Sequence, residues 1–197
     1  MTRIIAGSAG GRRLQTPRGD ATRPTSDRVR EALLSAVDAW AGSLRGLRVL
    51  DLYAGSGAVG LEAWSRGAEA VTLVESDRRT ADLVRANARA VGCPVAEVIA
   101  RSVSAFLASA PRAPYDLVFA DPPYPLADDA VAEVLGALVE GGWLSDDALV
   151  VVERSGRSPE PAWPAGLVPL PGRRGAKRYG ETTLWFAEHP AEDAAGE

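Results

Sequence analysis

A carboxylate, two prolines and an aromatic residue, Asp121-Pro122-Pro123-Tyr124, come directly after an apolar run at residues 115–120. Each proline restricts the residue before it to extended backbone, so the segment is stiff and its carbonyl groups have few local N–H partners. Such a segment can direct the Asp121 carboxylate and the Pro122 carbonyl at the two hydrogens of an amino group. Tyr124 adds a flat face on which the ring that carries the amine can stack.

This arrangement suits the methylation of an exocyclic amine, whose nitrogen lone pair is delocalised into its ring. Acceptors on both hydrogens help to draw the lone pair out of the ring plane, and they stabilise the positive charge that develops on nitrogen. A general base is not required, because the methylated ammonium readily loses a proton afterwards. The sequence therefore predicts catalytic roles for Asp121, Pro122, Pro123 and Tyr124.

A glycine-rich segment, DLYAGSGAVG, follows the first apolar strand at residues 51–60. Dinucleotide-binding loops have the spacing seen here at Gly55, Gly57 and Gly60, where missing side chains let a ligand approach the backbone. Glu75 ends the next predicted strand, where a carboxylate can hold ribose hydroxyls. Asp51 decides between cofactors, because its charge would repel a pyrophosphate and attract the sulfonium and ammonium of S-adenosylmethionine.

Short β-rich runs alternate with helical patterns through most of the chain. Strands are predicted at residues 47–52, 70–75, 95–100, 115–120, 149–153, 166–170 and 182–187, and helices at residues 58–66, 77–91, 103–109 and 127–139. This alternation predicts an α/β fold with a seven-stranded, mostly parallel sheet covered by helices on both faces. No helix separates the last two strands, so the C-terminal edge is expected to be an antiparallel hairpin.

The two ends of the chain differ from this central domain, which is predicted to span residues 25–187. Residues 1–24 form a basic N-terminal arm, with a β-hairpin expected around residues 9–11, and a helix should follow through Trp40. Residues 188–197, which include His189, are predicted to be an acidic C-terminal tail.

Length and composition place the chain among ordinary globular proteins. Its 197 residues, 46% of them hydrophobic, are enough for one domain with a substantial core. No apolar run approaches the roughly 18–20 residues that span a bilayer, and no signal peptide is evident. The single cysteine, Cys93, excludes an internal disulfide and a cysteine-cluster metal site. A cytoplasmic protein without a metal or an obligate protein partner is expected.

Positive charge is concentrated in two segments, although the formal net charge is −4. Residues 1–30 hold seven arginines against two acids, and residues 171–180 hold four basic residues and no acid. Such segments can present a basic face to a polyanion. The residues predicted to bind RNA phosphates are Arg12, Arg13, Arg23, Arg28, Arg173, Arg174, Lys177 and Arg178, whereas Arg3, Arg18 and Arg30 are interpreted as solvated charges.

With these residues in view, the sequence resembles the RsmD-type 16S ribosomal RNA guanine-N2 methyltransferases. The likeness extends over nearly the whole chain, from RIIAGSAGGRRLQTP at residues 3–17 through FADPPY at 119–124 to KRYGETTL at 177–184. The first and last of these stretches are more specific than the glycine loop or Asp-Pro-Pro-Tyr, which many amino-methyltransferases share.

The resemblance implies a Rossmann-like class I fold, S-adenosylmethionine as cofactor, and transfer to a guanine N2 amine of 16S ribosomal RNA in an assembling small-subunit particle. The cofactor-binding residues that follow are Asp51, Gly55, Ser56, Gly57, Glu75, Ser76, Ser102, Val103 and Asp121. Many methyltransferases have an acid after the third strand for the adenine amine. This chain has Arg101-Ser102-Val103 there, so the adenine contact falls to Ser102 or to backbone groups.

Three alternatives remain open from the sequence. A DNA adenine-N6 methyltransferase shares Asp-Pro-Pro-Tyr, but an arm of this size is too small to be a separate DNA-recognition domain. An NAD-dependent oxidoreductase fits the glycine loop but not Asp51. A catalytically silent RNA-binding factor leaves the carboxylates at three strand ends unexplained.

Overall fold

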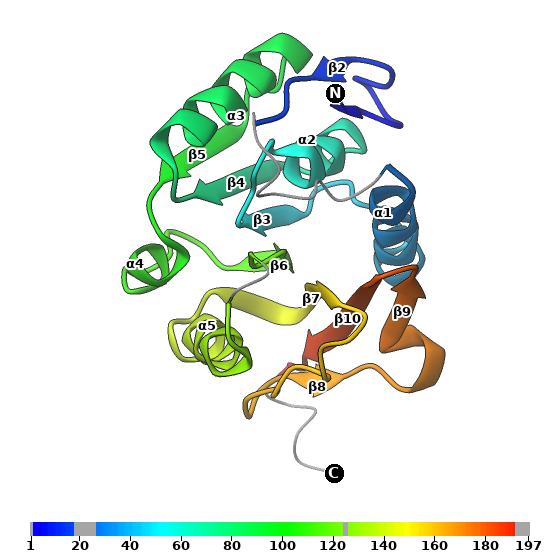
Figure 1. The fold of residues 1–197 in the computed structure, drawn as a ribbon, viewed down its shortest axis with the longest axis vertical. Helices are drawn as coiled ribbons and strands as arrows, with labels where there is room; N and C mark the ends of the chain where they lie inside the picture. Colours follow the sequence, from blue (N-terminus) through cyan, green and yellow to red (C-terminus); the bar gives the residue numbers. More distant parts are fainter. Residues whose placement is uncertain (1, 18–26, 124–125, 192–197) are drawn as a thin grey trace. The chain divides into compact units, whose positions relative to one another are not determined.

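Short apolar runs form a parallel sheet in the first half of the chain, in the order β5-β4-β3. These strands are β3 (Arg48–Leu52), β4 (Ala70–Glu75) and β5 (Ala96–Ala100) (Figure 1). In β3 the apolar side chains are fully buried, as expected for a strand that is covered on both faces. Because β3 and β4 are parallel, with Leu52 beside Val74, their carboxyl ends lie at the same edge of the sheet.

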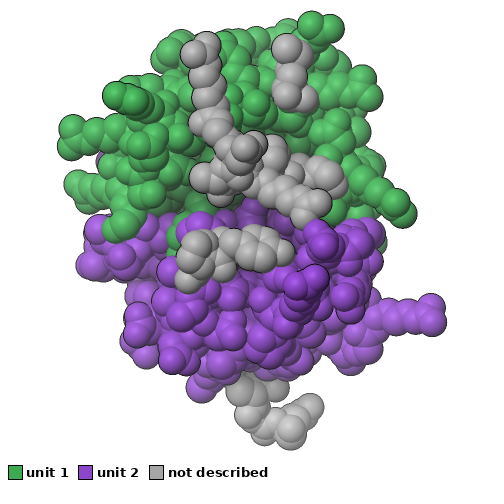
Figure 2. Space-filling view, viewed as in Figure 1, with its two compact units in different colours: residues 1–102 green, residues 103–197 purple. Residues whose placement is uncertain are grey.

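The computed structural model describes residues 2–17, 27–123 and 126–191. The chain divides into two compact units, residues 1–102 (unit 1) and residues 103–197 (unit 2), which Figure 2 colours separately. Unit 1 contains the glycine-rich loop and unit 2 contains Asp121. Among the described residues, no helix has both the length and the apolar character needed to span a bilayer.

The described residues of unit 1 form the helices α1 (Asp27–Ala41), α2 (Ala58–Ser65) and α3 (Arg78–Val91). Helix α2 packs on β3 and β4, and α3 packs on β4 and β5. The Asp77 side chain accepts a hydrogen bond from the Thr80 N–H at 2.8 Å, which caps the start of α3. Helix α3 ends at Val91, and its C-cap residue Gly92 has a left-handed φ of 77°, a conformation that glycine adopts readily.

The predicted N-terminal hairpin is present as β1 (Thr2–Arg3) paired antiparallel with β2 (Arg13–Leu14). Its Ile4, Ala9 and Leu14 side chains are buried. The Ala9 N–H donates to Ser65 Oγ in α2 at 2.9 Å, and β2 contacts α3. The described part of the predicted arm is therefore packed onto the helices of unit 1.

In unit 2, β6 (Tyr115–Ala120) and β7 (Leu144–Ser155) are parallel. β10 (Thr182–His189) pairs antiparallel with β7, and it also pairs with β8 (Val168–Pro169) and β9 (Ala176–Tyr179). Helices α4 (Val103–Leu107) and α5 (Asp128–Glu140) contact each other. The predicted α/β class, with parallel strands and an antiparallel C-terminal hairpin, is confirmed.

The boundaries near the C-terminus differ from those predicted. The basic segment at residues 171–180 holds a short 3-10 helix, η1 (Gly172–Arg174), and then β9, which pairs with β10 in a hairpin. β10 continues through His189, two residues beyond the predicted end, and the His189 ring nitrogen Nδ1 lies 3.1 Å from the Ser145 carbonyl oxygen. Strand β9 was not predicted because it is short and half-exposed, so its residues form no apolar run.

Candidate cofactor and amine-binding sites

Asp51 is a buried carboxylate near the carboxyl end of β3 in unit 1, with only 1% of its surface exposed. Its Oδ2 accepts a hydrogen bond from the Gly60 N–H at 2.9 Å. Burial raises the pKa of Asp51 to about 7, the Gly60 hydrogen bond opposes this rise, and the charge of Glu75 adds to it. A cation placed nearby would favour the ionised form, whereas an anion would be repelled by both acids.

Glu75 ends β4 and connects the glycine loop to the start of α3. Its Oε2 accepts from the Gly55 N–H at 3.0 Å, and its Oε1 accepts from the Asp77 N–H at 2.9 Å. The Ser76 hydroxyl lies 3.4 Å from the same Oε1. A carboxylate has about four lone-pair positions, so these contacts leave acceptor capacity for a ligand hydroxyl.

The glycines of the loop have different physical roles. A Cβ on Gly57 would lie 2.8 Å from a methyl carbon of Val84, and a Cβ on Gly60 would lie 2.9 Å from one of Val71, so both glycines allow close packing inside unit 1. Among the described residues, a Cβ on Gly55 would meet only the Tyr53 carbonyl oxygen, at 4.0 Å. The open space at Gly55 is therefore the place where a ligand can approach the loop backbone.

Tyr53 and Asn87 are two residues of this site that sequence reasoning missed. Tyr53 has a φ of 61°, a conformation that is uncommon for a non-glycine residue and often found at functional sites. The buried Asn87 side chain donates to the Ser56 carbonyl oxygen at 2.9 Å and also exchanges hydrogen bonds with the backbone of Gln15. The sequence feature that could have indicated Asn87 is a polar residue among the apolar residues on the buried face of α3.

The turn after β5 was predicted to contact the adenine of a cofactor. Ser102 is exposed, and Val103, the first residue of α4, has a buried side chain. The Val103 side chain belongs to the core, so only its backbone could take part in an adenine contact. The assignment of both residues stays a prediction.

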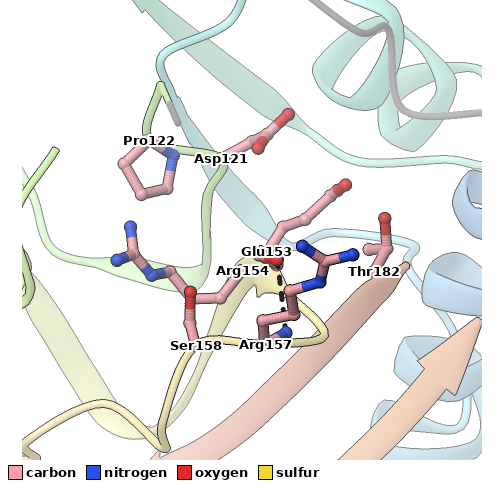
Figure 3. A pocket seen from close by; sticks show the side chains of 8 residues that line it. Asp121, Pro122, Glu153, Arg154, Arg157, Ser158 and Thr182 are labelled. Carbon is pink, nitrogen blue, oxygen red and sulfur yellow. Dashed lines mark hydrogen bonds between the residues drawn. The ribbon is translucent and has the colours of Figure 1, made fainter. Parts of the chain in front are cut away.

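Asp121 follows β6 in unit 2 and is half-buried, with Pro122 buried and Pro123 exposed. Both Asp121 and Pro122 line a pocket of about 250 Å³ at this end of the strand. Figure 3 shows the Asp121 carboxylate extending away from the Pro122 ring. The catalytic prediction for Tyr124 lies outside the described residues.

The predicted RNA-binding residues of unit 1 have different surroundings. Arg13 and Arg28 are exposed, and Arg23 lies outside the described residues. Arg12 donates from Nη1 to the Val91 carbonyl oxygen at 2.7 Å, so its guanidinium also satisfies the C-terminus of α3. RNA binding by these residues stays a prediction.

The predicted RNA-binding residues of unit 2 lie on η1 and β9. Arg173, Arg174 and Arg178 are exposed. The Lys177 ammonium lies 5.8 Å from the centroid of the Phe186 ring, within reach of a cation–π contact. The three exposed guanidinium groups are available to an anionic partner, whereas part of Lys177 is used in packing.

The prediction that Arg30 is a solvated charge is wrong, because its side chain is fully buried in unit 1. Arg30 Nη2 lies 3.0 Å from Asp27 Oδ1 and also donates to the Arg3 carbonyl oxygen. Its Nε lies 3.7 Å from Oε2 of the buried Glu62, and Glu62 accepts from the Ile5 and Ala6 N–H groups. This network binds the N-terminal hairpin to α1 and α2.

Comparison with known proteins places these features in one family. A family model described as Conserved hypothetical protein 95 matches residues 2–188. Ribosomal RNA small subunit methyltransferase D of Escherichia coli is 38% identical over 163 residues, which cover 83% of this chain and 79% of that protein. The protein of the same name from Haemophilus influenzae is 38% identical over 77% of each chain. The chain belongs to this methyltransferase family.

Solved structures of similar proteins have the same fold as this methyltransferase. The yhhF protein of Escherichia coli matches with a TM-score of 0.82 and 34% identity, over 96% of this chain and 98% of that one. The methylase HI0767 from Haemophilus influenzae matches with a TM-score of 0.76 and 31% identity, over 96% and 98% of the two chains. The predicted Rossmann-like methyltransferase fold is confirmed.

Proposed function

We propose that this methyltransferase transfers a methyl group from S-adenosylmethionine to the exocyclic N2 amine of a guanine in 16S ribosomal RNA. Asp121-Pro122 at the end of β6, in a chain 38% identical to small-subunit ribosomal RNA methyltransferases, is the observation that carries the proposal. An assembling small-subunit particle in the bacterial cytoplasm is the proposed substrate and location.

The residues of unit 1 fit S-adenosylmethionine better than a dinucleotide. When bound, this cofactor supplies an electrophilic methyl group on a sulfonium. Asp51 and Glu75 are two neighbouring acids at a loop whose Gly55, among the residues that the structure describes, has more open space than Gly57 and Gly60. In this proposal Asp51 attracts the cationic part of the cofactor, Glu75 accepts from the ribose, and the Gly55 backbone borders the ligand. A pyrophosphate would face two acids instead.

Asp121 and the Pro122 carbonyl oxygen orient the amine in the proposed reaction. Each accepts one hydrogen bond from the guanine N2 amine, which helps to localise the lone pair on the nitrogen instead of leaving it delocalised into the ring. The Asp121 carboxylate then stabilises the positive charge that develops on nitrogen. Tyr124 is proposed to stack on the base. No residue has to remove the proton before the methyl group is transferred.

Methyl transfer tested on separate substrates decides the function. With tritiated S-adenosylmethionine, we expect incorporation into small-subunit particles or free 16S RNA, recovered as N2-methylguanosine after nucleoside analysis. DNA serves as the comparison substrate. Recovery of N6-methyladenine from DNA, with no N2-methylguanosine from RNA, would favour the DNA adenine-N6 methyltransferase that shares Asp-Pro-Pro-Tyr.

The exposed arginines of η1 are proposed to bind RNA phosphates. Replacing Arg173 and Arg174 with Glu should weaken RNA binding and flatten its salt dependence by roughly one to two units of log Kd per log salt, because each phosphate contact contributes about 0.7–0.9. Binding isotherms over a salt series measure this slope. The control replaces Arg45 and Arg89, two exposed arginines of unit 1, with Glu. Equal slopes for both double variants would remove η1 from the RNA interface.

A further inference from the structure

Asp121 has a second carboxylate beside it in unit 2. β6 and β7 are parallel, and Ala120 at the end of β6 pairs with Val152 of β7. The residue after each member of this pair is an acid: Asp121 directly follows β6, and Glu153 is the next residue of β7. Because neighbouring strands lie about 4.8 Å apart, the two acids begin close together at this end of β6. Figure 3 shows both side chains extending from this strand end in the same direction.

The pocket around these two acids combines acceptors with donors. It is lined by Asp121, Pro122, Glu153, Ser155, Arg157 and Thr182, among others. Arg154 is held by Asp128 Oδ1 at 2.6 Å, on the side of α5. The side chain of Arg157, by contrast, is exposed, and its backbone N–H donates to Ser155 Oγ at 3.2 Å. Figure 3 shows the Arg157 guanidinium in the part of the pocket where Glu153 and Thr182 lie.

The size of the pocket limits what it can hold. Its volume of about 250 Å³ is below the roughly 300–1,000 Å³ typical of sites for drug-sized ligands. A single nucleobase is a ligand of suitable size, whereas a whole nucleoside-based cofactor is not. The polar groups of the pocket should therefore be matched to the edge of one base.

Guanine and adenine present opposite hydrogen-bonding groups next to the amine. Guanine carries two adjacent donors, N2–H and N1–H, followed by the O6 acceptor, whereas the N1 of adenine is an acceptor. We propose that Glu153 is a specificity-determining residue that accepts the guanine N1–H while Asp121 accepts from N2. The inference rests on the proposed function. It adds a residue that distinguishes guanine from other purines.

The two acids match guanine because two neighbouring acceptors meet two neighbouring donors. Arg157 provides a donor for O6, the group that guanidinium most often reads on guanine. An adenine turned toward Asp121 would place the N1 lone pair against the negatively charged Glu153 carboxylate, and two acceptors that face each other repel. Discrimination from one such contact is expected to be about 10–100-fold.

A substrate pair that differs at N1 and position 6 tests Glu153. 2-Aminopurine keeps the 2-amine but has an unprotonated N1 and no O6. We would place guanine or 2-aminopurine at the position mapped for wild type, in 16S RNA ligated around a synthetic segment and reconstituted with small-subunit proteins. Single-turnover methyl transfer by wild type, Glu153→Gln and Glu153→Ala is then compared. Glu133→Gln, an exposed position on α5, is the matched control.

Wild type should prefer guanine by at least about tenfold, and Glu153→Gln should reduce that preference by about tenfold or more, because the amide can donate to an unprotonated N1. Glu153→Ala should slow guanine methylation without the gain on 2-aminopurine, and Glu133→Gln should match wild type. Melting temperatures and cofactor affinity confirm that each variant is folded. The absence of N2-methylguanosine with wild type would overturn the proposed function itself. N2-methylguanosine formed with an unchanged preference in Glu153→Gln would overturn only the role of Glu153.

Discussion

Asp121→Ala should lower the turnover of methyl transfer by about 10²–10³, the scale on which one preorganised polar partner of a transition state acts. The physical reason is that the amine then lacks one of its two acceptors, and the positive charge on nitrogen loses its nearest proposed carboxylate. The melting temperature should stay close to wild type, since Asp121 is half-buried after β6 and belongs to no helix or strand. Single-turnover rates on small-subunit particles measure the effect.

Asp121→Asn separates an acceptor from an obligatory base. Its amide oxygen still accepts one hydrogen bond, so this variant should keep measurable activity, well above that of Asp121→Ala. Asp147→Asn is a matched control, because this exposed residue of β7 has a φ of 60° that asparagine also tolerates. Folded Asp121→Asn protein that binds cofactor but is as inactive as Asp121→Ala would contradict the acceptor mechanism.

The sequence predicted the elements that carry the strand-end acids most closely. β4 and β6 have the predicted bounds, because each is an apolar run that stops at Glu75 or Asp121. The conformation of Gly57 follows from its spacing in the loop, and its φ is 77°. Local patterns of this kind contain the information needed to place a residue at the end of a strand.

Contacts between distant segments could not be predicted from local patterns. In the local sequence Arg30 looks like a solvated helix residue, because its contacts with Glu62 of α2 and with the Arg3 carbonyl form only in the folded protein. The pairing of β6 with β7 is irregular between Tyr115 and Leu117 of β6, which pair with Leu144 and Leu149 of β7. Asp147, with its positive φ, lies between those two residues of β7. The proximity of Glu153 to Asp121 follows from the pairing of β6 with β7, which the local sequence around Glu153 does not indicate.

Cofactor binding should weaken as the pH falls below about 7, because Asp51 then takes up a proton. Burial, together with the charge of Glu75, raises the pKa of Asp51 to about 7 in the protein without ligand, despite the hydrogen bond from Gly60. A cationic cofactor binds the ionised carboxylate, so below this pKa each pH unit should weaken binding by up to about tenfold. The dissociation constant of S-adenosylmethionine should be about 100-fold higher at pH 5 than at pH 7.5 by calorimetry.

Asp51→Asn is the control for this dependence, since its amide oxygen can still accept from the Gly60 N–H while carrying no charge. The variant should bind the cofactor weakly at pH 7.5 and show little further loss toward pH 5. Without cofactor it should melt above wild type at pH 7.5. A carboxyl whose folded pKa is raised from 3.8 to about 7 makes the fold less stable as the pH rises through that interval, by at most about 4 kcal/mol. The difference in melting temperature should therefore narrow toward pH 4. An identical pH profile of cofactor affinity in both proteins would show that another group titrates and that Asp51 does not bind the cationic part of the cofactor.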